Sequence, residues 1–295
     1  MKPVVKIWFA DIFPRCREFF KWVLSRNYEL VLDCENPDYL IYSDFGEESL
    51  KYQKCTRIYY TGENLRPNFQ ECQFALTFDY SDNPNHYRLP LYVLDNFARW
   101  IEYGSIDAWD ALCKPKPSPS DVLKSKTKFC NFVVSNPNSE VRNKFFELLS
   151  QYKRVDSAGS HLNNMGKTLP KEDHLFFKSK LEFQRDYKFS IAFENSSHLG
   201  YLTEKILDPM LANSLPIYWG DPFVHKDFNP KSFINAGAFK TLEELVEWVI
   251  KVDQNDILYF KYTEQPYFYE NKLNSAMNLD LLLGFFGRIF TKYSG

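Results

Sequence analysis

The stretch from residue 188 to residue 222 constrains the fold more than any other part of the chain. An apolar run at residues 188–193 ends in polar groups. A glycine-bearing loop and a helical pattern then precede a second apolar run within residues 213–222. Thr203 stands where a helix N-cap is expected, because its hydroxyl can accept a hydrogen bond from the free amides of a first turn. The order strand, loop, helix, strand predicts one unit of a parallel α/β sheet.

The same alternation runs through most of the 295 residues, a length that favours two domains. We predict an α/β fold with an N-terminal domain at residues 1–125, a C-terminal domain at residues 126–272 and a helical tail at residues 273–295. Residues 114–126 lack an apolar period and are predicted to be a linker. The predicted strands are residues 4–9, 29–32, 39–42, 57–61, 74–78, 128–135, 188–193 and 231–234. The predicted helices are residues 15–25, 91–103, 139–150, 175–186 and 241–252.

Charge and cysteine content narrow the class of protein. A net charge of −2 argues against a nucleic-acid partner, because phosphate recognition normally leaves a basic excess. The six cysteines form no C-x-x-C pair, which favours reduced thiols in a cytoplasmic protein over secretion with three disulfides. The first apolar stretch is too short for a signal peptide or a membrane span, and no transmembrane segment is predicted.

Two helix starts carry a positive charge where the helix dipole disfavours it. Lys205 follows Thr203 and Glu204, and Arg142 lies in the first turn of the helix predicted at residues 139–150. A bound phosphate would relieve both conflicts, because a helix N-terminus with a nearby cation is an anion site. The alternative for each is an ordinary solvated helix residue.

The same segments carry a resemblance to a known family. Phe193-Glu194-Asn195-Ser196, Tyr201, Thr203-Glu204-Lys205 and Pro216-Ile217-Tyr218-Trp219-Gly220 resemble the donor-binding signature of the α-1,3/4-fucosyltransferases, a GDP-fucose-dependent family that includes the Helicobacter enzymes. Tyr60-Thr61-Gly62-Glu63-Asn64 is similar to a second segment of that family. The resemblance implies two Rossmann-like domains that face a cleft, the GT-B type of glycosyltransferase fold.

The resemblance also implies roles for single residues. Glu63 would be the general base that takes a proton from the acceptor hydroxyl. Arg142 and Lys205 would contact the donor diphosphate, and Glu204 would accept hydrogen bonds from the ribose. Two further positions, Asn195 and Tyr201, would donate hydrogen bonds to the diphosphate or the sugar.

Glu194 has two readings, a place near the fucose or a role in orienting its neighbours. No Asp-x-Asp pair follows a strand, so no metal site is predicted. GDP-fucose would be the donor substrate and no cofactor is required, although a divalent metal could stimulate the reaction. One departure from the family pattern is Pro209, which should kink or shorten the helix that begins at Glu204.

The expected reaction is inverting transfer of L-fucose from GDP-fucose to the 3-hydroxyl or 4-hydroxyl of N-acetylglucosamine in an N-acetyllactosamine-type glycan. One alternative is a related GT-B enzyme that uses another sugar nucleotide, and a second is a non-catalytic protein that binds nucleotide sugars or glycans. The tail at residues 279–293 is predicted to be a helix that packs on a domain. The alternative is a peripheral membrane contact through its apolar face, with Arg288 and Lys292 at an anionic surface.

Overall fold

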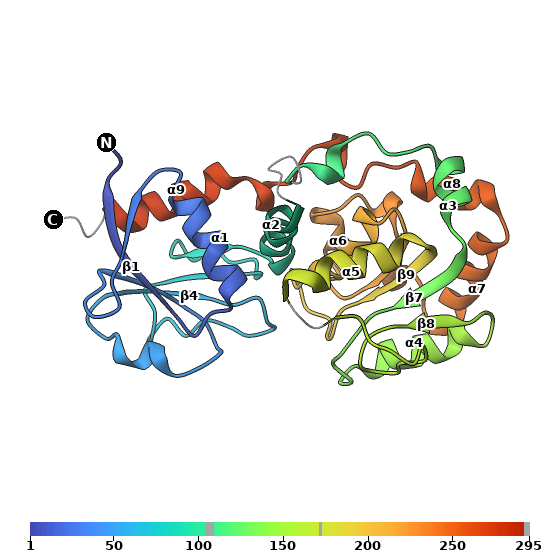
Figure 1. Cartoon of the computed structure of the whole chain (residues 1–295), viewed down its shortest axis with the longest axis horizontal. Coiled ribbons are helices and arrows are strands. Elements are labelled where there is room, and N and C mark those ends of the chain that lie inside the picture. The colour runs from blue at the N-terminus through green and yellow to red at the C-terminus, as the bar shows by residue number, and fades with distance from the viewer. Residues whose placement is uncertain (104–108, 171–172, 292–295) are drawn as a thin grey trace. The chain divides into compact units, whose positions relative to one another are not determined.

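The computed structural model describes residues 1–103, 109–170 and 173–291 and shows two compact units (Figure 1). The first unit comprises Met1–Ala98 and Ser275–Gly295, and the second comprises Arg99–Asn274. Each unit is α/β with a parallel sheet, which confirms the predicted fold class. This division differs from the predicted boundaries, since residues 99–125 belong to the second unit and most of the tail belongs to the first. No helix of the described residues is long and apolar enough to cross a bilayer.

The first unit contains a six-stranded sheet in the order β2-β1-β3-β4-β5-β6, and every neighbouring pair is parallel. Buried side chains occupy every position of β3, β4 and β5, as expected for parallel strands covered on both faces. The three-residue strand β6 was not predicted, because it has no apolar alternation. The strands are β1 (Val4–Ala10), β2 (Glu29–Leu32), β3 (Tyr39–Tyr42), β4 (Thr56–Tyr60), β5 (Phe74–Thr77) and β6 (His86–Arg88).

Three helices accompany this sheet: α1 (Pro14–Leu24), α2 (Leu91–Tyr103), which continues into the second unit, and α9 (Leu279–Thr291). The C-terminal helix α9 lies beside α1 although the two are far apart in sequence (Figure 1). The ring of Phe286 contacts that of Phe20 with centroids 6.1 Å apart, and the Tyr39 hydroxyl donates to the carbonyl of Phe290 at 3.2 Å. The apolar face of the tail is thus buried in the first unit. Lys292 and Tyr293, part of the predicted tail, lie outside the described residues.

The second unit contains a five-stranded parallel sheet in the order β11-β10-β9-β7-β8. Its central strand β9 is buried at all seven positions. The strand predicted at residues 231–234 begins only at Ile234, because Pro230–Ser232 forms a 3-10 turn in which the Asn229 side chain accepts from the Lys231 amide. The strands are β7 (Lys128–Phe132), β8 (Val155–Ser157), which was not predicted, β9 (Tyr187–Phe193), β10 (Leu215–Trp219) and β11 (Ile234–Asn235).

The helices of this unit include one inside the predicted linker. The Ser118 side chain accepts a hydrogen bond from the Asp121 amide, and Pro119 occupies the first turn. These two residues favour a short helix, although the segment has no apolar period that would predict one. In the core, the ring of Phe145 stacks on that of Phe193 with centroids 4.8 Å apart. The helices are α3 (Pro119–Ser125), α4 (Glu140–Ser150), α5 (Asp173–Arg185), α6 (Glu204–Leu211), α7 (Leu242–Asp253) and α8 (Asp256–Thr263), of which α8 was not predicted.

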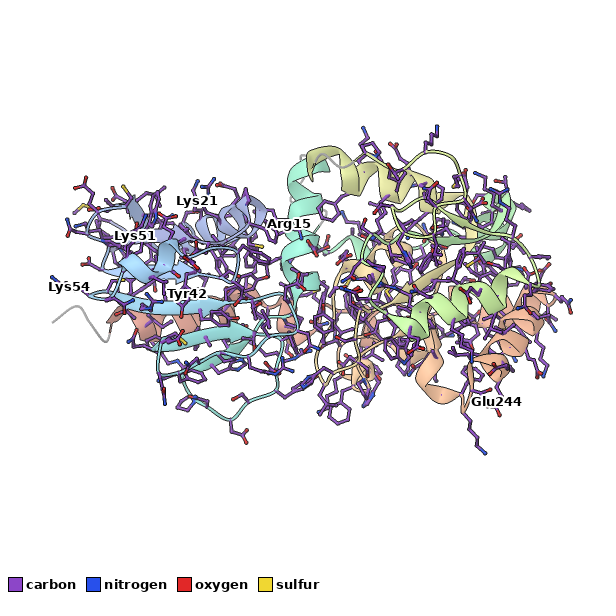
Figure 2. The ribbon with its side chains drawn as sticks, turned by 90° about the horizontal axis from the view of Figure 1, so that it is seen from below. Arg15, Lys21, Tyr42, Lys51, Lys54 and Glu244 are labelled. Atoms are coloured by element: carbon purple, nitrogen blue, oxygen red, sulfur yellow. The ribbon has the colours of Figure 1, made fainter. Side chains whose placement is uncertain are left out.

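Charged side chains lie mostly on the surface of each unit, as Lys54 and Glu244 do in Figure 2. Burial of a charge is costly unless it is paired and hydrogen-bonded. Buried charged residues of the second unit therefore need an explanation, and several of them lie around α6: Arg142, Lys180, Glu194 and Asp208.

Candidate functional site

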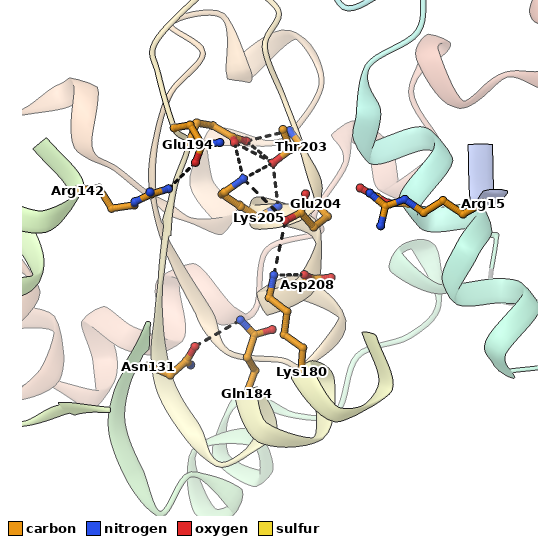
Figure 3. Close-up of polar contacts among 12 residues, drawn as sticks. Arg15, Asn131, Arg142, Lys180, Gln184, Glu194, Thr203, Glu204, Lys205 and Asp208 are labelled. Carbon is orange, nitrogen blue, oxygen red and sulfur yellow. Dashed lines mark hydrogen bonds and ion pairs between the residues drawn. The ribbon is translucent and has the colours of Figure 1, made fainter. Parts of the chain in front are cut away.

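The site is built on Glu194, which directly follows β9 and is fully buried. Its carboxylate accepts the backbone amide of Thr203 at 2.9 Å, and it accepts the Thr203 hydroxyl with Oε2 at 2.8 Å (Figure 3). The same Thr203 oxygen caps α6 by accepting the Lys205 amide. One threonine thus joins the end of the strand to the start of the helix, and Glu194 orients its neighbours, which is one of its two predicted readings.

Lys205 is the next member of this cluster. Its Nζ lies 3.2 Å from Glu194 Oε2 and 3.8 Å from Glu204 Oε1. Burial opposes the charge of Lys205, but Glu204 and Glu194 outweigh burial and raise the pKa of this ammonium above its usual range. We expected a phosphate to relieve the conflict between Lys205 and the helix dipole. The structure shows that two protein carboxylates already do so, and this conflict alone therefore does not indicate a ligand.

Arg142 differs from Lys205 in this respect. Its side chain is fully buried, its Nη1 donates to Asn195 Oδ1 at 2.7 Å, and its Nη2 donates to the carbonyl of Asn136. Among the described residues no carboxylate lies within ion-pair distance of the guanidinium, and its buried Nε has no hydrogen-bond partner. Burial lowers the pKa of Arg142 from its ordinary value. An anionic ligand would compensate this charge.

The remaining predicted donor residues lie in the same region. Asn195 follows Glu194 and holds Arg142 through its amide oxygen. Tyr201 is 2% exposed, and its phenol is close enough to contribute to the pKa values of both Arg142 and Lys205. Glu204 begins α6. The structure therefore brings together all five predicted donor-binding residues and Glu194.

Pro209 and Gly220 set the length of α6 and the space around Glu194. Pro209 lies inside α6, and the helix ends two residues later at Leu211, in line with the predicted shortening. Gly220, directly after β10, lies against Glu194, and a Cβ at Gly220 would collide with the Glu194 side chain. Glycine is required here because the buried carboxylate and the backbone after β10 approach so closely.

Glu63 lies in the first unit, in the loop that follows β4. Its side chain is exposed, as a group that must meet a substrate needs to be, and its amide donates to Thr61 Oγ1 at 3.1 Å. The loop is held by Arg66, which pairs with Asp79 at 2.9 Å and donates to Asn64 Oδ1 at 3.1 Å. The predicted position of Glu63 at a strand end is confirmed, and its catalytic role remains a prediction.

One residue of the cluster was missed from the sequence. Lys180, on α5, is 4% exposed, and its Nζ lies 2.7 Å from Asp208 Oδ2 and 3.7 Å from Glu204 Oε1 (Figure 3). The sequence did contain a sign that Lys180 is buried. Lys180 lies three positions after Phe177 and one before Leu181, and residues with this spacing share one helix face, on which both apolar residues are buried. A lysine on that face must be buried and must find carboxylate partners.

Within the described ranges, no group of three or more histidine, cysteine, aspartate or glutamate side chains is arranged to hold a metal ion. The prediction that the reaction needs no metal is not tested by this observation.

Comparisons with known proteins agree with this arrangement. Residues 5–95 match the family model described as the α-(1,3)-fucosyltransferase FucT N-terminal domain, and residues 123–281 match the C-terminal model of glycosyltransferase family 10 (fucosyltransferase). The chain is 34% identical to α-(1,3)-fucosyltransferase FucT of Helicobacter pylori, over 93% of this chain and 61% of that protein. It is also 34% identical to GDP-fucose protein O-fucosyltransferase 3 of Xenopus laevis, over 49% of this chain and 32% of that one. The chain thus spans less than two thirds of the length of these relatives.

Solved structures extend the likeness to the fold. A crystal structure of an α1,3-fucosyltransferase superposes with a TM-score of 0.78 at 31% identity, covering 98% of this chain and 90% of that one. A structure of an α1,3-fucosyltransferase with GDP-fucose gives a TM-score of 0.75 at 29% identity, covering 98% and 91%. A further match, at 9% identity and a TM-score of 0.51, is to an Anabaena protein with UDP and glucose, and it bears on the fold alone. By its match to these models and structures, the chain belongs to glycosyltransferase family 10, the fucosyltransferases.

Proposed function

We propose that this chain transfers L-fucose from GDP-fucose to the 3-hydroxyl or 4-hydroxyl of N-acetylglucosamine in an N-acetyllactosamine-type glycan, with inversion at the anomeric carbon. The names of its relatives support the donor and the acceptor class. One matching structure is described with GDP-fucose. A bovine relative is named a 3-galactosyl-N-acetylglucosaminide 4-α-L-fucosyltransferase, and a mouse relative is named a 4-galactosyl-N-acetylglucosaminide 3-α-L-fucosyltransferase.

The observation that carries the proposal is the buried guanidinium of Arg142. Buried charges are normally paired, yet this one is held by two amide-type oxygens and by no carboxylate among the described residues. A diphosphate has two anionic groups, and the planar guanidinium of arginine can donate several hydrogen bonds to them. Lys205 and the start of α6 would lie on the same side of this ligand, because Asn195 and Glu194 connect them to Arg142.

The chemical roles follow from this arrangement. The departing GDP carries negative charge, so Arg142 and Lys205 would stabilise it in the transition state, with amides of α6 as further donors. Glu204 would accept ribose hydroxyls, and Asn195 and Tyr201 would donate to the diphosphate or the sugar. With two cations in place, we propose that a divalent metal is not required.

Glu63 would remove the proton of the attacking acceptor hydroxyl as its oxygen bonds to the anomeric carbon. Its exposed position in a loop held by Arg66 supports this role. Glu63→Gln should retain donor affinity while kcat falls on the order of 10²–10⁴-fold. A variant with unchanged kcat would assign the base to another group.

The decisive assay combines the purified protein with GDP-fucose and N-acetyllactosamine, with and without a chelator, and determines the linkage of the product. A fucosylated trisaccharide in both conditions supports the proposal. Product formed only from another sugar nucleotide would favour the related GT-B enzyme, and GDP binding without any product would favour the non-catalytic protein.

The diphosphate site has its own test. Arg142→Met should weaken GDP binding by on the order of tenfold or more, because a charge-assisted contact to phosphate is lost. The matched control is Arg154→Met, which removes an arginine of the same unit whose side chain is 67% exposed. Equal affinities of the two variants would contradict the role of Arg142.

The free cysteines support a reducing compartment, and we propose a cytoplasmic location on that basis. All six cysteines are free thiols in the structure. A peripheral membrane contact through α9 is not part of the proposal, since most apolar residues of that helix, with Leu281 as an exception, are buried in the first unit.

A further inference from the structure

Lys180 connects α5 to α6 beside the candidate site. It projects from α5 toward α6, and its ammonium reaches Asp208 Oδ2 at 2.7 Å and Glu204 Oε1 at 3.7 Å (Figure 3). Glu204 and Asp208 are four positions apart, so they stand on one face of α6 in consecutive turns. A single lysine thus contacts both carboxylates of that face from outside the helix.

Glu204 lies between two ammonium groups. The same oxygen, Oε1, is 3.7 Å from Lys180 Nζ and 3.8 Å from Lys205 Nζ. Removal of Lys180 would take one cation away from this carboxylate, and the other, Lys205, also pairs with Glu194. Glu204 is therefore held in part by a lysine from another helix, outside the Thr203-Glu204-Lys205 segment.

The five charges form a series of alternating sign: Glu194, Lys205, Glu204, Lys180 and Asp208. Each lysine is shared by two carboxylates, and the side chains of Lys180 and Asp208, at the far end, are 5% and 1% exposed. Charges that share partners in this way are coupled, so a change at one end alters the preferred position of its neighbours. Asp208 anchors Lys180, and Lys180 in turn holds Glu204.

We propose that Lys180 is a positioning residue of the nucleotide site, which acts through Glu204 and sets donor affinity rather than the rate of the chemical step. This inference rests on the proposed function, in which Glu204 contacts the ribose. The competing explanation is that Lys180 only fastens α5 to α6 through Asp208. The two explanations differ in whether nucleotide affinity responds once the fold is preserved.

The test uses Lys180→Met combined with Asp208→Asn. These replacements nearly conserve volume and remove both members of the buried pair, which avoids the large destabilisation caused by removing one partner alone. Lys178→Met is the control, because Lys178 lies on the exposed side of the same helix. Thermal unfolding of each variant verifies the fold, and calorimetric titration with GDP gives Kd.

Misplacement of a positioning group by about 1 Å can lower the rate of a reaction about a hundredfold. We expect the double variant to raise the Kd for GDP on the order of tenfold, and the control to leave it unchanged. In donor kinetics the change should appear in KM, with kcat altered by less than about threefold. In a Glu204→Gln background the double replacement should add less than about twofold, because the residue through which Lys180 acts no longer carries a charge.

An unchanged Kd in a folded double variant would overturn the proposal and assign Lys180 to fastening the helices. An equal effect with and without Glu204→Gln would overturn it as well, since Lys180 would then not act through Glu204. If the parent chain binds GDP but forms no fucosylated product, the proposed reaction fails while the Kd comparison still decides the role of Lys180. A parent chain that binds no GDP would overturn both.

Discussion

Thr203→Val gives the most direct test of how the candidate site is held together. Valine has nearly the shape of threonine, so the change replaces the hydroxyl with a methyl group and alters little else. That hydroxyl donates to the Glu194 carboxylate at 2.8 Å and also accepts the Lys205 amide as the N-cap of α6. The N-cap and the hydrogen bond to Glu194 end together, and the hydroxyl is also lost as an acceptor for Lys205 Nζ at 3.1 Å. Glu194, which is fully buried, loses one of its hydrogen-bond donors.

The expected loss of stability is the sum of these two effects. Loss of a threonine N-cap costs about 1 kcal/mol. A hydrogen bond to a charged group contributes about 1.5–3 kcal/mol, and the carboxylate cannot turn to water instead because it is buried. We therefore expect Thr203→Val to lower the free energy of unfolding of the second unit by about 3 kcal/mol.

The matched control is Thr241→Val, at the start of α7. Thr241 caps its helix by accepting the Glu244 amide, but it is exposed and donates to no carboxylate in any interaction that the structure records. It should lose only the capping energy, about 1 kcal/mol. Urea unfolding followed by tryptophan fluorescence and circular dichroism gives both values. If the two variants lose equal stability, the hydrogen bond from Thr203 to Glu194 does not contribute to stability, and Glu194 does not hold the start of α6 through Thr203.

Two further predictions concern the close contact at Gly220 and the reactivity of the cysteine thiols. Gly220→Ala should lower the free energy of unfolding by about 1–3 kcal/mol in urea, because a methyl group there collides with Glu194; unchanged stability would show that the backbone gives way freely. In the folded protein Cys34, which is exposed, should react first with a thiol-specific reagent. Burial raises the pKa of Cys16 and that of Cys72 to about 11, so these thiols should react only on unfolding; similar rates for all three would contradict their burial.

Local pattern was enough to predict most of the elements. Apolar runs bounded by turn residues marked the long strands, the N-cap Thr203 marked the start of α6, and an apolar face marked α7. The same patterns could not reveal β6 and β8, each three residues long, because such strands exist only through pairing with a neighbour in the sheet. Short edge strands have no periodic signal of their own.

The sequence by itself determined which residues are candidates for the site. It placed Lys205 and Arg142 in first helical turns and Glu63 after a strand, because these positions depend on neighbours within a few residues. Its family resemblance then indicated a nucleotide-sugar site, and the structural comparisons agree.

The tertiary structure alone decided how the charges are paired. Lys205 and Arg142 looked equivalent in sequence, yet Lys205 has two carboxylate partners and Arg142 has none within ion-pair distance among the described residues. Glu194 is a buried support of the helix start, and Lys180 arrives from another helix. The physical reason is that the energy of a buried charge depends on partners brought close by packing, and a pattern of local spacing carries no information on those partners.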